Sequence, residues 1–340
     1  MTKTRLCRTF QTAPAAVPRD DSAKYLRSGL TAEGFAAPDW LVPDLEDGTA
    51  PDMKDEALEN VRELLPEYAP EFPGEIWPRV EWGYDSESLR ERGVEQIETL
   101  SETVGEHVDG FVVPKVGRLE DVRAAESAVA AAARETGADI ELAVIVESAR
   151  ARSDLREISG FGHESLLTAL VFGPVDYTAE LGGREVGQRP QWSGLYEALS
   201  NEASANGLLS IGGPFDRLFR ERAGVTFYNG DGYADHVERE ARVGLDGSWS
   251  LHPNQTAQAN RIHLPTDDEL RTAVSKIETF VEAKGTGTGA VAIDGQMVDE
   301  ATLKNFENTV ETVSIVHETN DEQTTERYDE ELLDRALALR

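Results

Sequence analysis

Charged and polar residues recur in this sequence at the points where short apolar runs end. The segments at these points are Asp44–Asp47, Arg79, Pro114–Lys115, Glu147–Ser148, Gly173–Asp176, Gly213–Phe215 and His252–Pro253. Any one of them fits a strand-end cap or a solvated loop charge. Their recurrence after consecutive runs instead favours one shared edge where reactive side chains converge.

Two carboxylates, Glu147 and Asp176, follow the fifth and sixth of these runs. Neighbouring parallel strands would bring them within a few ångströms of each other. Hard oxygen ligands with no histidine or cysteine cluster nearby favour Mg²⁺, with Mn²⁺ possible. The alternative is that each carboxylate forms a salt bridge with an arginine such as Arg150 or Arg184.

An arginine beside a divalent cation suits a substrate that has a carboxylate next to a carbonyl. The cation would bind both oxygens, while Arg79 would meet developing negative charge. This combination describes a 2-oxo acid. Arg79 as a structural arginine of a barrel rim is the alternative, and the carboxylates of Asp44–Asp47 would orient metal-bound waters from outside the ligand set.

Eight apolar runs alternate with helix-like segments over residues 1–262, which predicts a (β/α)8 TIM barrel as the catalytic domain. The runs are Leu6–Thr12, Trp40–Leu45, Ile76–Trp82, Gly110–Val113, Ile140–Val146, Leu167–Phe172, Leu208–Ile211 and Trp249–Leu251. The segments with helical spacing include Met53–Leu65, Glu87–Val104, Leu119–Thr136 and Arg217–Arg222. A doubly wound open sheet is the alternative, because periodicity does not show closure.

Residues 263–340 have a different pattern and predict a small C-terminal lid or oligomerisation domain. Its expected parts are a helix over Asp267–Lys284, a flexible joint at Gly285–Gly289, a hairpin over Ala290–Val298, a helix over Ala301–Val316, a loose stretch over His317–Arg327 and a helix over Tyr328–Leu339. A hairpin on a glycine-rich joint fits a moving lid, and a dimerisation arm fits nearly as well.

The composition excludes several classes of function. With 64 acidic and 33 basic residues, the formal charge is −31, which leaves no basic surface for nucleic acid and repels anionic membranes. No apolar stretch is long enough to span a bilayer, and the polar first ten residues are unlike a secretion signal, so a cytoplasmic protein is expected. Of the basic residues only seven are lysine, and acid excess with scarce lysine is typical of halophilic proteins; an acidic mesophilic enzyme is the alternative.

An ordered set of motifs resembles a known family. The motifs are Arg8-Thr9-Phe10, Asp44-Leu45-Glu46-Asp47 with Lys54, Arg79, Val113-Pro114-Lys115-Val116, Ile145-Val146-Glu147-Ser148, Phe172-Gly173-Pro174-Val175-Asp176-Tyr177 and Ser250-Leu251-His252-Pro253 with Gln255. From about residue 5 to residue 318 the chain resembles the citrate lyase β-subunit and malyl-CoA lyase family of HpcH/HpaI aldolase-like proteins. Within that family it looks most like the haloarchaeal enzymes, β-methylmalyl-CoA lyase and its malate synthase relative.

The resemblance implies roles for individual residues. Glu147 and Asp176 match the residues that bind Mg²⁺ in the family, and Arg79 matches the arginine that contacts glyoxylate and the enolate. Asp299 matches a lid aspartate that family members insert into a neighbouring subunit as the acid/base. The resemblance therefore implies a homo-oligomer, a trimer or hexamer. From the residues alone, Asp299 is equally well explained as the N-cap of the following helix.

Coenzyme A is the anionic partner that the resemblance implies, and a chain of charge −31 needs a local cationic entry for it. Lys24 and Lys115 are candidates for that entry. By resemblance, Arg8 and Phe10 lie where family members touch the coenzyme. The chain departs from the common pattern at Gln11–Ala16, where relatives have a glycine-rich turn.

The activity implied is reversible Claisen-type cleavage of β-methylmalyl-CoA into propionyl-CoA and glyoxylate, and of malyl-CoA into acetyl-CoA and glyoxylate. Asp299 would exchange a proton with the enolate carbon. A malate synthase, which also hydrolyses the thioester, is the main alternative. A metal-dependent aldolase of free acids and a catalytically silent subunit are the others.

Overall fold

The computed structural model describes residues 5–183, 192–222, 224–284, 290–293 and 295–340. The chain divides into two compact units, one of Cys7–Asn260 and one of Arg261–Arg340 with residues 5–6. The division lies close to the boundary expected at residue 262. Each unit is described by itself.

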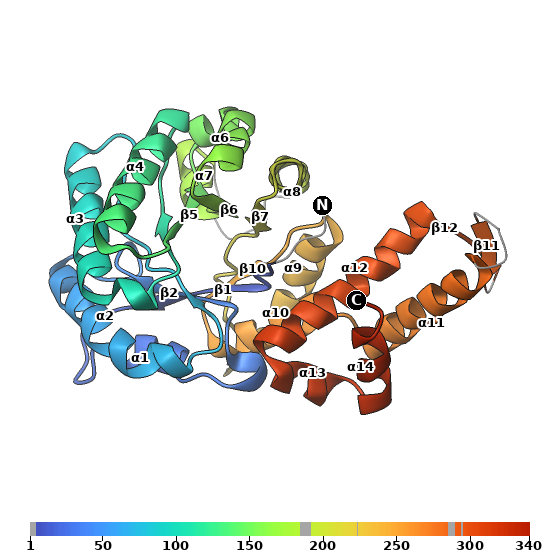
Figure 1. The fold of residues 1–340 in the computed structure, drawn as a ribbon. Coiled ribbons are helices and arrows are strands. Elements are labelled where there is room, and N and C mark those ends of the chain that lie inside the picture. Colours follow the sequence, from blue (N-terminus) through green and yellow to red (C-terminus); the bar gives the residue numbers. More distant parts are fainter. Residues whose placement is uncertain (1–4, 184–191, 223, 285–289, 294) are drawn as a thin grey trace. The chain divides into compact units, whose positions relative to one another are not determined.

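Eight parallel strands form a closed barrel in Cys7–Asn260, and several of them are labelled in Figure 1. They are β1 (Thr9–Pro14), β2 (Trp40–Asp44), β3 (Glu75–Ile76), β4 (Gly110–Val113), β5 (Glu141–Val146), β6 (Leu167–Phe172), β7 (Leu209–Ile211) and β10 (Ser248–Ser250). The pairing orders are β10-β1-β2-β3 and β4-β5-β6-β7. Parallel bridges between Arg79 and Val112 and between Ile211 and Gly247 join the two sets into a ring. The predicted (β/α)8 barrel is confirmed, and closure rules out the open sheet.

Helices and short 3₁₀ turns connect the strands and surround the barrel. The helices are α1 (Lys24–Leu30), α2 (Lys54–Tyr68), α3 (Glu87–Val104), α4 (Leu119–Thr136), α5 (Ala149–Ser153), α6 (Leu155–Phe161), α7 (Pro174–Glu180), α8 (Ser193–Asn206), α9 (Gly230–Arg242) and α10 (Pro253–His263). The 3₁₀ turns are Gly34–Ala36, Pro51–Met53, Ala69–Glu71, Gly105–His107 and Gly162–Glu164. The bounds of α3 and α4 match the sequence expectation because both have clear end signals. Ser86 caps α3, and Gly137 ends α4 in a left-handed conformation at φ 75°.

The barrel interior is filled by large apolar side chains. Trp40 and Trp77 stack with ring centroids 3.9 Å apart, and Phe10 meets Trp249 edge-on. Gly110 makes room for this layer, since a Cβ there would lie 2.2 Å from Trp77. The interior is therefore a packed core, and reactive groups can gather only at its ends.

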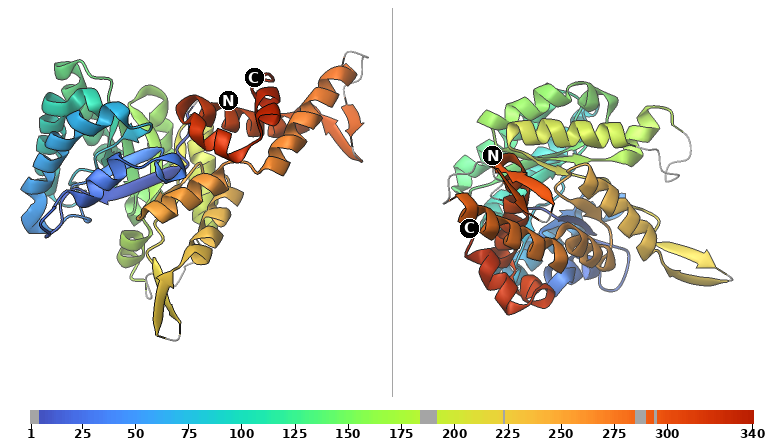
Figure 2. Two further views of the ribbon diagram at one scale, coloured as in Figure 1. Left: turned by 90° about the horizontal axis from the view of Figure 1, so that it is seen from below. Right: turned by 90° about the vertical axis from the view of Figure 1, so that its right-hand side faces the viewer.

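A β-hairpin stands where a helix was expected at Arg217–Arg222. Strands β8 (Phe219–Arg222) and β9 (Val225–Tyr228) pair antiparallel. In both views of Figure 2 the hairpin projects from the rest of Cys7–Asn260. The helical prediction is wrong because Gly224, at φ 76°, reverses the chain just after the short segment that gave the helical signal.

The unit Arg261–Arg340 holds a second antiparallel hairpin among helices. Its elements are α11 (Asp267–Lys284), β11 (Ala290–Ile293), β12 (Gln296–Asp299), α12 (Glu300–Thr319), α13 (Asp321–Arg327) and α14 (Glu330–Leu337). The stretch expected to be loose is helical, because Thr324 is buried and its hydroxyl meets His317 Nδ1 at 2.7 Å. The expected joint Gly285–Gly289 lies outside the described residues, and the lid role stays a prediction.

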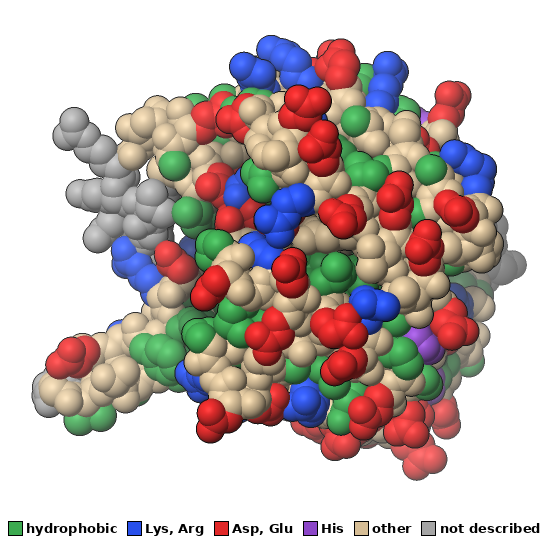
Figure 3. Space-filling model, turned by 90° about the vertical axis from the view of Figure 1, so that its left-hand side faces the viewer, with side chains coloured by type: hydrophobic (Ala, Val, Ile, Leu, Met, Phe, Trp, Pro, Cys, Tyr) green, Lys and Arg blue, Asp and Glu red, His purple; other side chains and the backbone are tan. Residues whose placement is uncertain are grey.

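The charge of the chain is carried on its surface. On the face drawn in Figure 3, acidic side chains are spread widely, with fewer basic ones among them. Within the described residues no helix is both long and apolar enough to cross a bilayer.

Candidate active site

The C-terminal ends of the barrel strands form the mouth of the barrel, and charged residues from five consecutive strands meet there. Asp44 ends β2, and Arg79 follows β3. Lys115 follows β4, and Glu147 follows β5. Asp176 lies in the first turn of α7, directly after β6. The structure therefore brings together Arg79, Lys115, Glu147 and Asp176, as the sequence predicted.

Glu147 is buried, and its carboxyl group is closely surrounded by the backbone of Lys115 and Gly173. Its Oε1 accepts a hydrogen bond of 2.7 Å from the backbone N–H of Lys115. Its Oε2 lies over Gly173, where a Cβ would approach to 2.3 Å. Burial raises the pKa of Glu147 to about 8, and the charge of Asp176 adds to the rise.

Asp176 is half-buried and is presented by the N-terminal turn of α7, which begins at Pro174. Its carboxylate has no hydrogen bond or ion pair within the described residues. The salt bridge with Arg150 considered from the sequence is therefore absent from the described residues, and Arg184, the other arginine considered, lies outside them.

Arg79 is fixed by a two-pronged contact with Asp44. Its Nε and Nη2 donate to the two carboxylate oxygens of Asp44 at 2.9 and 2.5 Å, and its Nη1 lies 3.3 Å from Glu46 Oε2. The guanidinium lies 5.6 Å from the ring of Trp249 in the barrel interior. It therefore points into the mouth, while its pairing with Asp44 also gives it the structural role considered from sequence.

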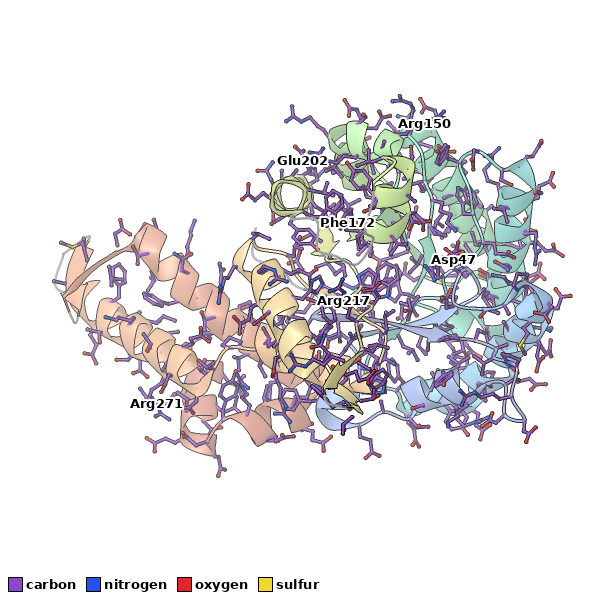
Figure 4. All side chains as sticks on the ribbon, turned by 180° about the vertical axis from the view of Figure 1, so that it is seen from behind. Asp47, Arg150, Phe172, Glu202, Arg217 and Arg271 are labelled. Carbon is purple, nitrogen blue, oxygen red and sulfur yellow. The ribbon has the colours of Figure 1, made fainter. Side chains whose placement is uncertain are left out.

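Lys115 contacts three acidic groups at the mouth, Glu147 through its backbone N–H and Glu46 and Asp47 through its ammonium. Its ammonium donates to Glu46 and, at 2.8 Å, to Asp47, which is labelled in Figure 4. Burial alone would lower the pKa of Lys115, but the charges of Glu46 and Asp47 raise it above its ordinary value. Its backbone adopts φ 49°, a conformation that is costly for a residue with a Cβ and is characteristic of functional sites.

Lys54 is a further residue of the site that had no role assigned from the sequence. It is buried at the first position of α2 and donates to the backbone oxygens of Leu45 and Glu46 at 2.8 and 2.5 Å. These bonds hold the loop that carries Glu46 and Asp47. The scarcity of lysine was the available signal, since a lysine retained in this composition indicates a specific contact.

The donor set at the mouth fits a hard divalent cation. Glu147 and Asp176 offer carboxylate oxygens, and the pKa of Glu147 is raised first by burial and then by the neighbouring charge of Asp176. No cluster of three or more histidine, cysteine or acidic side chains suited to a metal ion occurs in the described residues. The two carboxylates would thus provide only part of a coordination shell, as is usual for Mg²⁺.

The coenzyme prediction for Arg8 and Phe10 needs correction. Arg8 precedes β1, at the end of the barrel opposite the mouth, and its guanidinium is bound by Asp39 at 2.6 and 2.9 Å. Arg8 is 1 % exposed and Phe10 is fully buried, so neither has surface left for a coenzyme. Lys24 differs, because it is exposed at the start of α1 and its ammonium has no partner within the described residues.

Asp299 lies in the other unit, at the end of β12. Its carboxylate caps α12 by accepting from the backbone N–H and the hydroxyl of Thr302, both at 2.8 Å. The backbone and hydroxyl hydrogen bonds from Thr302 hold the pKa of Asp299 below its usual range. The capping role considered from the sequence is therefore present in the structure.

A closed parallel barrel with an arginine and paired carboxylates at its mouth defines a class of metal-assisted barrel enzymes. The family model described as HpcH/HpaI aldolase/citrate lyase matches residues 29–253. The chain belongs to this family.

Relatives within the family differ in how similar they are to this chain. An L-malyl-CoA/beta-methylmalyl-CoA lyase from Haloarcula marismortui is 63% identical over 98% of this chain and 97% of its own. An apparent malate synthase from the same organism is 35% identical over 96% of this chain and 75% of its own. A Haloferax volcanii malate synthase solved as a magnesium/glyoxylate complex is 30% identical, with a TM-score of 0.70 and 98% of both chains covered.

Proposed function

We propose that this protein is a Mg²⁺-dependent carbon–carbon lyase that cleaves β-methylmalyl-CoA into propionyl-CoA and glyoxylate, and malyl-CoA into acetyl-CoA and glyoxylate. The observation that carries the proposal is the buried carboxyl group of Glu147 at the barrel mouth, close enough to both Asp176 and the fixed Arg79 for their charges to act on it. The identity of 63% to a lyase with these two substrates in its name supports the choice of reaction.

Glu147 and Asp176 would hold the metal ion, which would polarise the hydroxyl and carboxylate oxygens of the malyl group and the aldehyde and carboxylate oxygens of glyoxylate. The negative charge at the mouth gives this binding its driving force. Glu147 must lose its proton to act as a ligand, and its hydrogen bond from the Lys115 N–H keeps the carboxylate oriented when it does.

Arg79 would stabilise negative charge that develops as the carbon–carbon bond breaks. Two of its five N–H groups are used by Asp44 and a third faces Glu46, so the guanidinium is already oriented before substrate arrives. Hydrogen-bond donors that are oriented before the reaction need no reorganisation in the transition state. They speed the reaction because they stabilise the developing charge without that cost.

Asp299 would exchange the proton at the α-carbon of the acyl-CoA, acting in the site of a neighbouring subunit of a homo-oligomer. While Asp299 caps α12, the hydrogen bonds from Thr302 lower its pKa and keep it ionised; once released from them, an aspartate of ordinary pKa is still ionised near neutral pH and can act as the base in the condensing direction. To act there its carboxylate must leave Thr302, so the helix cap and catalysis compete for one side chain.

Lys24 and Lys115 are the cations we propose for the entry of the coenzyme. Lys24 is exposed at the start of α1 and has no ion pair with any residue that the structure describes, whereas Lys115 is already engaged by Glu46 and Asp47. The first contact with coenzyme phosphates therefore falls to Lys24. A cytoplasmic location and a trimer or hexamer complete the proposal.

Malate synthase is the second candidate, because the thioester hydrolysis that separates it from the lyase needs only a placed water molecule. The difference between 63% identity to a lyase and 35% identity to an apparent malate synthase from one organism favours the lyase.

The proposal is tested in the cleavage direction. Wild-type protein with Mg²⁺ and β-methylmalyl-CoA should release glyoxylate and propionyl-CoA in equal amounts. Asp176→Asn should reduce the rate by at least about a hundredfold, because it removes a ligand charge. The matched control is Glu180→Gln on the exposed end of the same helix, which should retain full activity; unchanged turnover in Asp176→Asn would contradict the proposal.

A further inference from the structure

Helix α9 carries a buried histidine–glutamate pair that the proposed mechanism does not use. His236 and Glu240 are four residues apart on α9, with His236 Nε2 3.1 Å from Glu240 Oε1. Glu240 is fully buried. Burial alone would lower the pKa of His236, but the charge and hydrogen bond of Glu240 raise it above its ordinary value.

Both side chains hold the backbone of one turn, Gly212–Phe215, which directly follows β7. The N–H of Gly213 donates to Glu240 Oε1 at 3.1 Å, and His236 Nε2 lies 2.9 Å from Gly213 O. A carbonyl oxygen can only accept, so Nε2 carries the proton. The fit is close, because a Cβ on Gly212 would lie 2.0 Å from Glu240 Oε1.

The Gly212–Phe215 turn also packs against the start of α7. A Cβ on Gly213 would lie 2.6 Å from Pro174 Cδ and 3.2 Å from Phe172 O. Pro174 is the first residue of α7, and Asp176 lies in the same helical turn. A shift of Gly213 would therefore displace Pro174 and, through the first turn of α7, Asp176. Phe172, labelled in Figure 4, is the last residue of β6, just before this helix.

Stability is a weak reason for a buried ion pair to be present. Apolar residues of similar volume often give equal or greater stability, because removing two charges from water offsets their attraction. A pair of charges does, however, set the direction of hydrogen bonds that an apolar pair cannot make. The bonds from this pair both end on Gly213.

We propose that His236 and Glu240 are positioning residues, which fix the Gly212–Phe215 turn and through Pro174 set the place at which Asp176 presents its carboxylate to a divalent cation. The inference rests on the proposed function, since it concerns the metal-binding role of Asp176. Neither side chain touches substrate or metal.

The test compares two substitutions of one residue. His236→Phe keeps a ring beside Phe215, which lies 5.6 Å from the imidazole, but removes the donor to Gly213 O. His236→Gln keeps a donor near the Nε2 position. Glu238→Gln, on the same helix but half exposed and paired with Arg242, is the matched control. Dissociation constants for Mn²⁺ are measured without substrate by electron paramagnetic resonance, beside kcat, KM and the melting temperature.

We expect His236→Phe to weaken Mn²⁺ binding and lower kcat by about tenfold or more, the effect typical of residues that orient metal ligands. The KM for the acyl-CoA should change less than about twofold, since the cations proposed for coenzyme entry, Lys24 and Lys115, are not part of the Gly212–Phe215 turn. His236→Gln should restore most of the Mn²⁺ affinity, and Glu238→Gln should match the wild type. A merely structural role would move the melting temperature and leave the Mn²⁺ affinity of the folded protein unchanged.

A folded His236→Phe variant with wild-type Mn²⁺ affinity would overturn the inference. So would a loss of Mn²⁺ affinity in His236→Gln as large as the loss in His236→Phe. Should His236→Phe not fold, the double variant His236→Leu/Glu240→Met replaces the pair by apolar residues and carries the same expectation. Wild-type protein that binds no Mn²⁺ would instead refute the metal site of the proposed function, and the inference with it.

Discussion

Glu147 combines burial with a neighbouring negative charge, and this combination makes it the most responsive titrating group at the mouth. Its pKa is raised from 4.5 to about 8. The folded state therefore holds its proton more tightly than the unfolded state does. Without metal, the stability contributed by this group is present at low pH and is lost as the pH rises from about 4.5 to about 8.

Metal binding should consequently release a proton from Glu147. At pH 6.5, binding of Mg²⁺ should displace close to one proton, and well above pH 8 it should displace almost none, because the carboxylate is then already ionised. Calorimetry in two buffers of different ionisation enthalpy measures this number. Proton release that does not decline with pH would contradict the assignment, and Glu180→Gln should behave as the wild type.

Arg79→Lys keeps the positive charge but loses the two-pronged contact with Asp44. We expect kcat to fall by about a hundredfold, the loss typical of removing one fixed donor from a developing anion, with a smaller change in KM. Steady-state kinetics test this against Arg118→Lys, an exposed arginine with a single bond to Asp154. Near wild-type kcat would show that the charge alone is sufficient.

At the scale of elements, the sequence predicted the strands and helices whose bounds follow from apolar periodicity and from residues typical of helix ends. Strands β4 and β6 and helices α3, α4 and α11 have the expected bounds. The hairpin β8–β9 was missed because a six-residue segment with mixed residues fits a helix as well as a strand. The helix α13 was missed because its polar residues hide the burial of Thr324.

Within the candidate site, only the residues that follow directly after a barrel strand could be placed from the sequence. Arg79, Lys115, Glu147 and Asp176 meet because parallel strands bring their C-terminal ends together. Arg8 was placed at the wrong end of the barrel. The apolar run Leu6–Thr12 did not show where within it the first strand begins and ends. The pair His236 and Glu240 gave no signal, since burial of charged residues follows from tertiary packing.

Helix α2 contributes to the site through Lys54 at its first turn. Lys54→Met keeps the length of the side chain but leaves the carbonyls of Leu45 and Glu46 without their donor. We expect the free energy of unfolding to fall by about 2 kcal/mol, because buried acceptors lose their hydrogen bonds. Denaturant unfolding in concentrated KCl measures the change.

Activity of Lys54→Met should fall as well, since the loop that bears Glu46 and Asp47 loses its anchor. Lys304→Met, an exposed substitution on α12, is the control for losing a lysine from this chain. Equal stability of the two variants would contradict the anchoring role.

At the scale of the whole molecule, the proposed mechanism needs more than one chain, because Asp299 would act in a neighbour's site. Asp299→Ala and Glu147→Gln should each be inactive alone. Co-assembled in equal amounts, they should recover about a quarter of wild-type activity, since random pairing gives that share of sites with both groups intact. No recovery in verified mixed oligomers would place Asp299 outside its neighbour's site.

The central claim is the reaction itself, and the most direct measurement separates the lyase from the synthase. Purified protein in concentrated KCl with Mg²⁺ is given glyoxylate with propionyl-CoA and then with acetyl-CoA, while the acyl-CoA adduct and free thiol are both followed. We expect β-methylmalyl-CoA and malyl-CoA to accumulate without free coenzyme A. Free thiol released in step with glyoxylate consumption would contradict this expectation and assign the protein as a malate synthase.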